Sequence, residues 1–527
     1  MKKFWQKWKK PILIGLGIFV LALFLRIYNL TTLPVFGDEA IYIRWAQIMR
    51  TEPGLRFVPL SDGKQPLFMW SVIPFLKVLT DPVFAGRAVS VATGLGSLVG
   101  IFLLTFYLFK SKKTAFIASL IYAISPFSLF FDRMALVDSM LTMFGIWTLL
   151  GAVLVTKTLR LDIAMLTGFS LGGALLTKSP ALFFVLLLPT TILLANWPKN
   201  KKKRLVYLGK LVSLWVIILV IAYGMYNILR LGPNFHMLGA RNQDYVFPIS
   251  HLWENPKDPF IFRPKEIFSW FWLMGPSVLV FLVPLGIYVG WKKHKRQILT
   301  LMFWGFLPIL VQAEYARVFT VRYILFSIPP LFILAAAGFL AKPLRLKRIL
   351  EIGLIIFILH SLTLNFSLLT QPENAKLPRV MRSGYLEEWT AGHGIAEVAD
   401  FLRNEWSREP EGQIVVGTEG FFGTLPDGLQ IYVNDLREIV VIGLGQPIKS
   451  IPKSLLESKE AGNRTYFVIN SSRFLGDPEK AGLELLAAYP KALRLEGTRE
   501  YNTLGPRDTL LFFEVTKEAI APKSEVK

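Results

Sequence analysis

The stretch MALVDSMLTMFGIWTLLGAVLVT, residues 134–156, decides the class of this protein. It is an apolar run of about 20 residues, the length that a helix needs to cross a ~30 Å hydrocarbon core. It also contains one carboxylate, Asp138. A carboxylate inside an apolar span needs a partner or a water-filled cavity. The stretch therefore predicts a membrane-spanning helix with an acid that has a specific role.

Similar apolar stretches recur along the 527 residues, of which 53% are hydrophobic and 18% charged. Soluble proteins carry about 25% charged residues, so a soluble globular enzyme is excluded, as is a disordered chain. An outer-membrane barrel is excluded because its strands would alternate with period two. The sequence predicts a polytopic α-helical membrane protein with about eleven spans. The predicted spans lie near 11–30, 83–109, 114–131, 134–156, 161–177, 180–197, 205–229, 270–291, 298–314, 322–341 and 349–369.

The basic residues lie mainly in short segments next to the apolar spans, as is typical of membrane proteins. The net charge is +22, from 59 Lys and Arg against 37 Asp and Glu. Much of the excess lies in short segments beside apolar spans, so it is not gathered on one nucleic-acid-binding surface. These segments are 1–10, 110–113, 157–160, 199–204, 292–296 and 342–348. With the N-terminus in the cytoplasm, all of them fall on the cytoplasmic side, which predicts residence in the plasma (inner) membrane and an external C-terminus.

That topology depends on segment 66–79 not crossing the membrane. The segment is short and contains Pro74, so we expect an interfacial or re-entrant helix. If it crossed, the basic segment 292–296 would lie outside, against the charge bias.

The composition changes near residue 370. Residues 1–370 are expected to form the membrane domain, with large outward loops at 31–82 and 230–269. Residues 371–527 are expected to form a soluble extracytoplasmic α/β domain. Within it, GIAEVADFLRNEW has helical spacing, and QIVVG, TYFVI and TLLFFEV have the composition of strands. The chain has no cysteine, which excludes disulfides and cysteine-ligated metals.

The first outward loop contains an acidic pair. In GDEAIYIRWAQIM, which starts at Gly37, the apolar residues share one helical face, so an amphipathic interfacial helix is expected. Asp38 and Glu39 lie in its first turn. Two interpretations remain open: the acids cap the helix and complement its dipole, or they carry chemistry.

Cations and a second acid occur at the outward ends of other spans. Lys64 lies in DGKQPLFMW, Arg133 and Asp138 in FDRMALVDSM, Lys178 in LLTKSPA, and Arg322 and Tyr323 in VRY. Each cation can be explained by snorkelling to the interface. Together with a buried carboxylate they also suggest a site for an anionic headgroup beside a carboxylate base.

The motifs, in their order, resemble the GT-C superfamily of polyprenyl-phosphate-sugar-dependent glycosyltransferases. The similarity is to bacterial members of the dolichyl-phosphate-mannose–protein mannosyltransferase family, which includes the aminoarabinose transferases. It rests on GDEAIY, KQPLFMW, GRAVS, DRMALVDSM, GALLTKSPA and VRYILFSIPPL, which together cover most of 1–340. Two residues depart from the family pattern. Gln65 stands where the motif often has Pro, and Gly63 stands where the aminoarabinose transferases have an acid.

The resemblance implies a GT-C fold and inverting transfer of a sugar from a polyprenyl-phosphate donor. The acceptor would be a hydroxyl of a protein Ser/Thr or of a cell-envelope glycan, on the outer face of the membrane. Asp38 would be the base, supported by Glu39, with Asp138 as a further acid. The donor phosphate and substrate would be bound by Lys64, Arg133, Arg322, Tyr323 and Tyr42.

Other functions remain open at this stage. A glycolipid transferase acting on lipid A is an alternative within the family. A lipid-linked sugar transporter or flippase is an alternative of another class, although no fixed internal repeat is visible. The expected partners are the donor lipid, the acceptor and membrane lipids, and nucleic acid is not expected. No cofactor is certain, and a divalent metal is possible.

Overall fold

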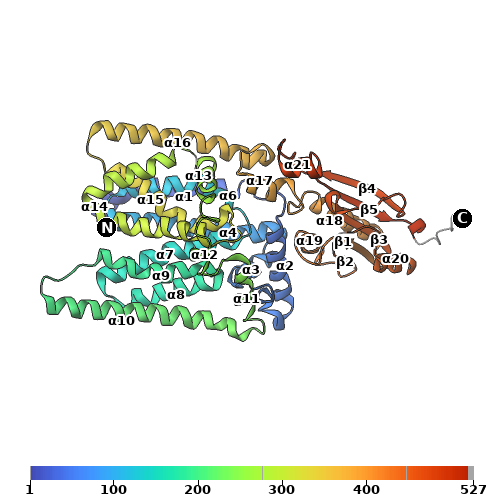
Figure 1. Cartoon of the computed structure of the whole chain (residues 1–527), viewed down its shortest axis with the longest axis horizontal. Coiled ribbons are helices and arrows are strands. Elements are labelled where there is room, and N and C mark those ends of the chain that lie inside the picture. Colours follow the sequence, from blue (N-terminus) through green and yellow to red (C-terminus); the bar gives the residue numbers. More distant parts are fainter. Residues whose placement is uncertain (1, 276, 447, 520–527) are drawn as a thin grey trace. The chain divides into compact units, whose positions relative to one another are not determined.

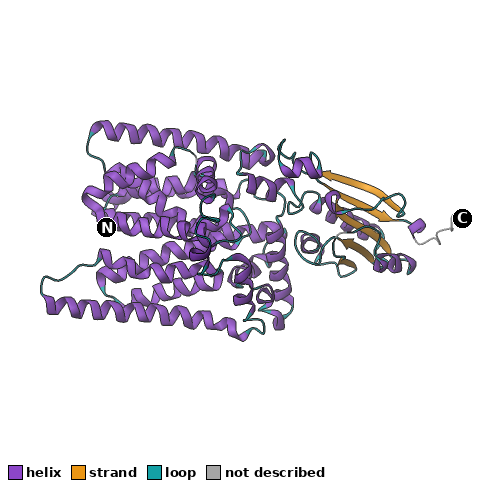
Figure 2. Cartoon of the chain, in the orientation of Figure 1, coloured by secondary structure: helices purple, strands orange, loops and turns teal. Residues whose placement is uncertain are grey.

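The computed structural model describes residues 2–275, 277–446 and 448–519, and its strands all lie in the C-terminal part (Figure 1, Figure 2). The chain divides into two compact units. The membrane unit consists of Met1–Leu30, Glu52–Ser71 and Arg87–Pro378. The second unit consists of Thr31–Thr51, Val72–Gly86 and Arg379–Lys527.

Long apolar helices dominate the first part of the chain. Seven of them are long and apolar enough to cross a membrane: Lys9–Ile27, Pro82–Phe109, Val137–Thr158, Lys201–Leu231, Leu279–Tyr315, Val321–Leu340 and Leu344–Thr370. The predicted polytopic helical class is therefore confirmed. The principal helices before residue 378 are α1 (Lys2–Ile27), α3 (Leu67–Leu76), α4 (Pro82–Phe109), α5 (Lys112–Ile124), α6 (Pro126–Phe131), α7 (Val137–Thr158), α8 (Leu161–Thr177), α9 (Leu182–Leu187), α10 (Lys201–Tyr226), α11 (Met237–Tyr245), α12 (His251–Glu254), α13 (Arg263–Met274), α14 (Leu279–Tyr315), α15 (Ile328–Ala337) and α16 (Leu344–Thr370).

Proline divides two of the predicted spans. The predicted span 114–131 consists of α5 and α6, separated at Ser125, and Pro126 occupies the first position of α6, where its missing N–H costs nothing. The predicted span 180–197 consists of α9 between two 3₁₀ segments, η3 (Ser179–Ala181) and η4 (Leu188–Leu194).

The helix α14 contains a reversal of the chain. His294 has non-helical dihedral angles, and a Cβ built on Gly290 would lie 2.5 Å from Cδ1 of Ile298. In a straight helix, residues eight apart are separated by about 12 Å, so the chain turns back here. The two predicted spans 270–291 and 298–314 correspond to its two halves. The predicted start at 270 is wrong, because α13 occupies Arg263–Met274 and α14 begins at Leu279.

The helix α3 is too short to span a bilayer. It has 10 residues, which rise about 15 Å, half of a typical hydrocarbon core. This length agrees with the interfacial segment that the predicted topology requires.

The second unit contains a mixed five-stranded sheet. Its strands are β1 (Ile414–Thr418), β2 (Ile439–Gly443), β3 (Arg464–Asn470), β4 (Leu483–Pro490) and β5 (Thr509–Val515), in the order β2-β1-β3-β5-β4. The first three strands are parallel, whereas β5 and β4 are antiparallel to their neighbours. Buried Val415, Phe467, Ile469, Phe513 and Val515 form part of its core. The predicted α/β domain is confirmed, and α18 (Ile395–Arg408) is the helix predicted over GIAEVADFLRNEW.

The helix α2 (Gly37–Thr51) belongs to this second unit. It packs against α19 (Asp427–Val433). Nε2 of Gln47 donates to the carbonyl of Ile431 at 2.9 Å, and Arg44 donates to the side chain of Asn434. The helix α2 is thus held by residues 431–434 of the same unit.

Candidate active site

In the membrane unit, an acid at the start of α7 pairs with a lysine at the end of α8. Asp138 lies in the first turn of α7 and is 3% exposed. Its Oδ1 is 2.7 Å from Nζ of Lys178, the residue at which α8 ends. Its buried Oδ2 accepts no hydrogen bond within the described part of the chain. One buried carboxylate oxygen therefore has no hydrogen-bond donor among the described residues, and the helix N-terminus stabilises the negative charge.

Tyrosine and arginine from η6 (Val321–Ser327) stand beside this pair. Nζ of Lys178 lies 4.3 Å from the ring centre of Tyr323, and the guanidinium of Arg322 lies 5.5 Å from the same ring. Cations at these distances are attracted to the ring face. The structure thus brings Asp138, Arg322 and Tyr323 together around Lys178.

Lys64 lies close to the same group. Its neighbour Gln65 donates to the hydroxyl of Ser179, which follows Lys178, at 3.0 Å. Nζ of Lys64 is 3.3 Å from Asp62. Lys64 and Tyr323 also act electrostatically on Tyr245 at the end of α11: burial raises the pKa of Tyr245, and the Lys64 charge opposes that rise.

Sequence reasoning missed two members of this cluster, Asp62 and Arg241. Asp62 pairs with Arg241 at 2.9 Å as well as with Lys64, so it links the loop 31–82 to the loop 230–269. Gly63 adopts φ +64°, and a Cβ there would lie 2.6 Å from Cβ of Arg241. The glycine that departs from the family pattern is therefore required by the close approach of α11.

Arg133 has a different position. Its guanidinium donates to the carbonyls of Leu25, Arg26, Tyr28 and Asn29, where α1 ends, at 2.7 to 3.0 Å. A cation at a helix C-terminus satisfies the last carbonyls and complements the dipole. Arg133 therefore holds the end of α1, and we do not retain it as a ligand of the donor phosphate.

In the second unit, the first turn of α2 carries Asp38 and Glu39. Glu39 is fully buried, and its Oε2 accepts a hydrogen bond from the backbone N–H of Phe36 at 3.0 Å. This is the reciprocal bond of a capping box, in which the third helical residue reaches back to the cap. Asp38 is the second residue of the helix and half-buried. The capping function belongs to Glu39, and Tyr42 lies one turn beyond Asp38 on the same face.

The start of α2 is fixed by a loop of the C-terminal domain. The N–H of Gly37 donates to the carbonyl of Thr390 at 3.1 Å, and the N–H of Gly392 donates to the carbonyl of Val35 at 2.9 Å. The ring of Phe36 lies 4.4 Å from that of Tyr385. These contacts hold the backbone directly before the acidic pair.

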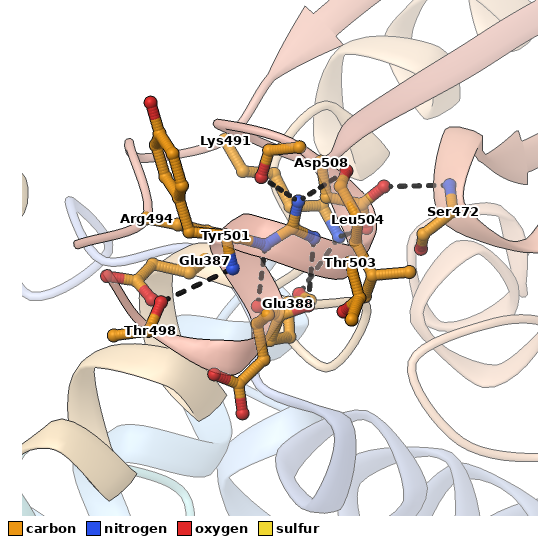
Figure 3. A network of polar contacts seen from close by, with 12 residues as sticks. Glu387, Glu388, Ser472, Lys491, Arg494, Thr498, Tyr501, Thr503, Leu504 and Asp508 are labelled. Carbon is orange, nitrogen blue, oxygen red and sulfur yellow. Dashed lines mark hydrogen bonds and ion pairs between the residues drawn. The ribbon is translucent and has the colours of Figure 1, made fainter. Parts of the chain in front are cut away.

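The same loop is held by a buried ionic network (Figure 3). Arg494 donates to both oxygens of Glu388, from Nε at 2.8 Å and from Nη2 at 2.9 Å. Nζ of Lys491 donates to the carbonyl of Glu388 at 3.0 Å and lies 3.6 Å from Asp508. Burial lowers the pKa of Lys491 to about 8, against the opposing effect of Asp508 and Glu419. A bidentate pair of this kind fixes both partners in one geometry.

In the described ranges, no three His, Asp or Glu side chains gather as a metal site would require. We assign no role to a metal.

The comparisons with known proteins agree with this architecture. Residues 58–233 match the family described as dolichyl-phosphate-mannose-protein mannosyltransferase. No curated protein sequence matches the chain.

Solved structures that resemble the chain have low sequence identity to it. ArnT from Cupriavidus metallidurans in the apo state has 13% identity and a TM-score of 0.59, covering 97% of this chain and 99% of that one. The same protein bound to undecaprenyl phosphate has 14% identity and the same TM-score and coverage. The archaeal oligosaccharyltransferase AglB from Archaeoglobus fulgidus has 12% identity and a TM-score of 0.49, covering 88% of this chain and 70% of that one. The predicted resemblance agrees with both findings: residues 58–233 match the mannosyltransferase family, and the chain has the fold of ArnT.

Proposed function

We propose that the protein transfers a sugar from a polyprenyl-phosphate donor to an acceptor hydroxyl on the outer face of the membrane, with inversion at the anomeric carbon. One observation carries the proposal: the segment that matches the family contains Lys64, Asp138 and Lys178, which lie together with Arg322 and Tyr323 in one polar cluster. The undecaprenyl phosphate bound to ArnT supports a lipid-phosphate donor.

The reaction needs a base and a stabilised leaving group. The acceptor hydroxyl gives its proton to Asp38, and its oxygen attacks the anomeric carbon. The bond from that carbon to the phosphate oxygen breaks on the opposite face, and the electron pair leaves with the phosphate, so the configuration inverts. Lys64 and Arg322 stabilise the departing phosphate by charge-assisted hydrogen bonds. Lys178 is held by Asp138 beside Tyr323, and we assign Tyr42, one turn beyond Asp38 on α2, to substrate binding.

The test is the cleavage of labelled donor. Purified protein incubated with radiolabelled polyprenyl-phosphate sugars should release polyprenyl phosphate and pass the sugar to an acceptor or to water. Movement of the intact lipid across liposomes without any cleavage would instead identify a transporter and overturn the proposal.

We expect Arg322→Ala to weaken donor use. The loss of one charge-assisted hydrogen bond to the phosphate corresponds to about 1.5–3 kcal/mol in transition-state stabilisation. Arg322→Lys should recover part of the activity, because lysine keeps the charge and lacks the bidentate fork. The measurement is kcat/KM for donor cleavage. Arg317→Ala is the control, since Arg317 is exposed and stands over the ring of Phe247. Equal activity of parent and Arg322→Ala would remove Arg322 from the site.

We propose the cytoplasmic location of the N-terminus and the external location of the C-terminal domain on the charge pattern. A reporter enzyme that is active only outside the membrane should be active when fused after Lys527. The same reporter inserted after residue 296 should be inactive. The reverse pattern would show that segment 66–79 crosses the membrane.

A further inference from the structure

The parallel part of the sheet in the second unit has a switch point. Strand β1 pairs with β2 on one side and with β3 on the other, and all three run in the same direction. In open α/β sheets, ligands bind beyond the carboxyl ends of such strands, where the connections diverge. At this edge lie Glu419, which follows β1, Asn470, which is the last residue of β3, and Arg473, which lies just beyond β3.

These three residues form a polar centre, in which Glu419 and Asn470 are buried and Arg473 is partly exposed. Glu419 is 2% exposed and accepts hydrogen bonds from the backbone N–H and Nδ2 of Asn470, at 2.8 and 2.7 Å. Nε of Arg473 lies 3.6 Å from Oε1 of Glu419. Oδ1 of Asn470, a residue 1% exposed, accepts no hydrogen bond within the described ranges. A buried acceptor of this kind ordinarily has a hydrogen-bond donor, so Oδ1 of Asn470 could accept a hydrogen bond from a ligand.

Exposed aromatic rings flank this centre. Phe421 and Phe422 are 76% and 56% exposed, in a loop whose flanking glycines, Gly420 and Gly423, both have positive φ. Trp389 is 38% exposed, and the guanidinium of Arg473 lies 3.8 Å from its ring centre. Two adjacent exposed phenylalanines on a loop held by left-handed glycines are not explained by packing within the domain.

The aromatic loop adjoins the helix that carries the proposed base. A Cβ built on Gly37 would lie 2.8 Å from Oγ1 of Thr424, the residue after Gly423. Gly37 also donates to the carbonyl of Thr390, next to Trp389. The aromatic side chains and Asp38 are therefore carried by backbone segments that touch each other.

We propose that Phe421, Phe422 and Trp389, with Asn470 and Arg473, bind the sugar rings of the acceptor next to its reacting hydroxyl. The inference rests on the proposed function and names its acceptor as a glycan. A sugar ring offers an apolar C–H face, which an aromatic ring covers, and hydroxyls that both donate and accept hydrogen bonds. The loop and the polar centre supply both kinds of partner.

Two other classes of occupant fit this surface less well. An extended polypeptide would add to an exposed strand edge, and the edges of this sheet are β2 and β4, not the loop. A lipid surface would use the exposed Phe421 and Phe422 and would leave the buried acceptor oxygen of Asn470 without a partner.

The experiment compares two acceptor preparations with one donor. Envelope vesicles of the host are treated either with proteinase K, which removes protein and leaves glycans, or with periodate, which cleaves sugar diols and leaves protein. The full-length protein is given a labelled polyprenyl-phosphate sugar with each preparation. Donor hydrolysis to water is measured in parallel, because it reports the proposed function without the acceptor.

The variant is Phe421→Ala/Phe422→Ala, and the matched control is Leu485→Ala/Leu486→Ala, another adjacent apolar pair on the same domain, 53% and 37% exposed. We expect label to enter the proteinase-treated vesicles and not the periodate-treated ones. The phenylalanine variant should raise the acceptor KM about tenfold, equivalent to about 1.4 kcal/mol, with donor hydrolysis unchanged. The control pair should behave as the parent.

Three results would overturn the inference. The first is label in periodate-treated vesicles alone, which identifies a protein acceptor. The second is cleavage of the donor with no label in proteinase-treated vesicles. The third is an equal loss of hydrolysis and transfer in the phenylalanine variant, which identifies a membrane or folding role for the loop. Failure of donor cleavage in the parent protein contradicts the proposed function itself.

Discussion

Replacing Asp38 with Asn should reduce sugar transfer by about 10²–10⁴-fold, the usual cost of losing a general base. The substitution removes the proton acceptor and preserves the size of the side chain. It should have little effect on folding, because Asp38 is the second residue of α2 and the capping bond is made by Glu39. The loss of one charge at a helix N-terminus costs about 0.3–1 kcal/mol.

The measurement is transfer of labelled sugar, together with donor binding and the thermal unfolding midpoint. Asp81→Asn is the matched control, since Asp81 is an exposed acid that accepts the backbone N–H of Phe84 at the start of α4. We expect the control to transfer normally. If Asp38→Asn transfers within about threefold of the parent, well below the range for base loss, Asp38 has no catalytic role.

The length of the apolar runs made much of the membrane fold predictable from the sequence. A helix that crosses a bilayer needs a long apolar run, so stretches such as 83–109 and 349–369 could be identified from composition alone. The limits of this rule appear where the chain turns within an apolar region. The start of α14 was misplaced because α13 ends in the apolar run Trp270–Met274, which resembles the beginning of a span.

Strand prediction succeeded in the sheet centre and failed at its edges. β1 and β3 are rich in β-branched and aromatic residues and are almost wholly buried. β4 has the sequence LELLAAYP, whose Leu, Glu and Ala favour helices, and its pairing with β5 decides its conformation. An edge strand of this composition has no local signal.

In the candidate site, the residue types were predictable from the sequence, whereas their partners in space were not. The residue types were predictable, because an acid in an apolar run needs a partner. Which cation pairs with Asp138 was not predictable: Lys178 lies 40 residues away, and it meets the acid through the packing of α7 on α8. Arginine commonly binds phosphate, so Arg133 was predicted as a ligand. In the structure its guanidinium instead donates to four carbonyls at the end of α1.

Replacing Asp132 should lower the stability of the fold, whereas replacing Asp38 should lower sugar transfer and leave the fold stable. It is fully buried, and its Oδ2 accepts from Nε and Nη2 of Arg26 at 3.0 and 2.8 Å. Tyr122 and Ser139 donate to it at 2.9 and 2.7 Å. Asp132→Ala leaves the buried Arg26 charge uncompensated, so the free energy of unfolding should fall by about 3–5 kcal/mol.

The measurement is unfolding of the purified protein in detergent, with Asp162→Ala as the control. Asp162 also pairs with an arginine, Arg160, but both side chains are more than half exposed, so no measurable loss is expected. In the double variant Arg26→Met/Asp132→Ala the uncompensated charge is gone, and part of the stability should return. Recovery should be incomplete, because Arg26 also donates to the carbonyls of Ala22 and Ala123. If Asp132→Ala unfolds like the parent, the ion pair does not hold α1 in place, and the fixed position of Arg133 at the end of that helix loses its support.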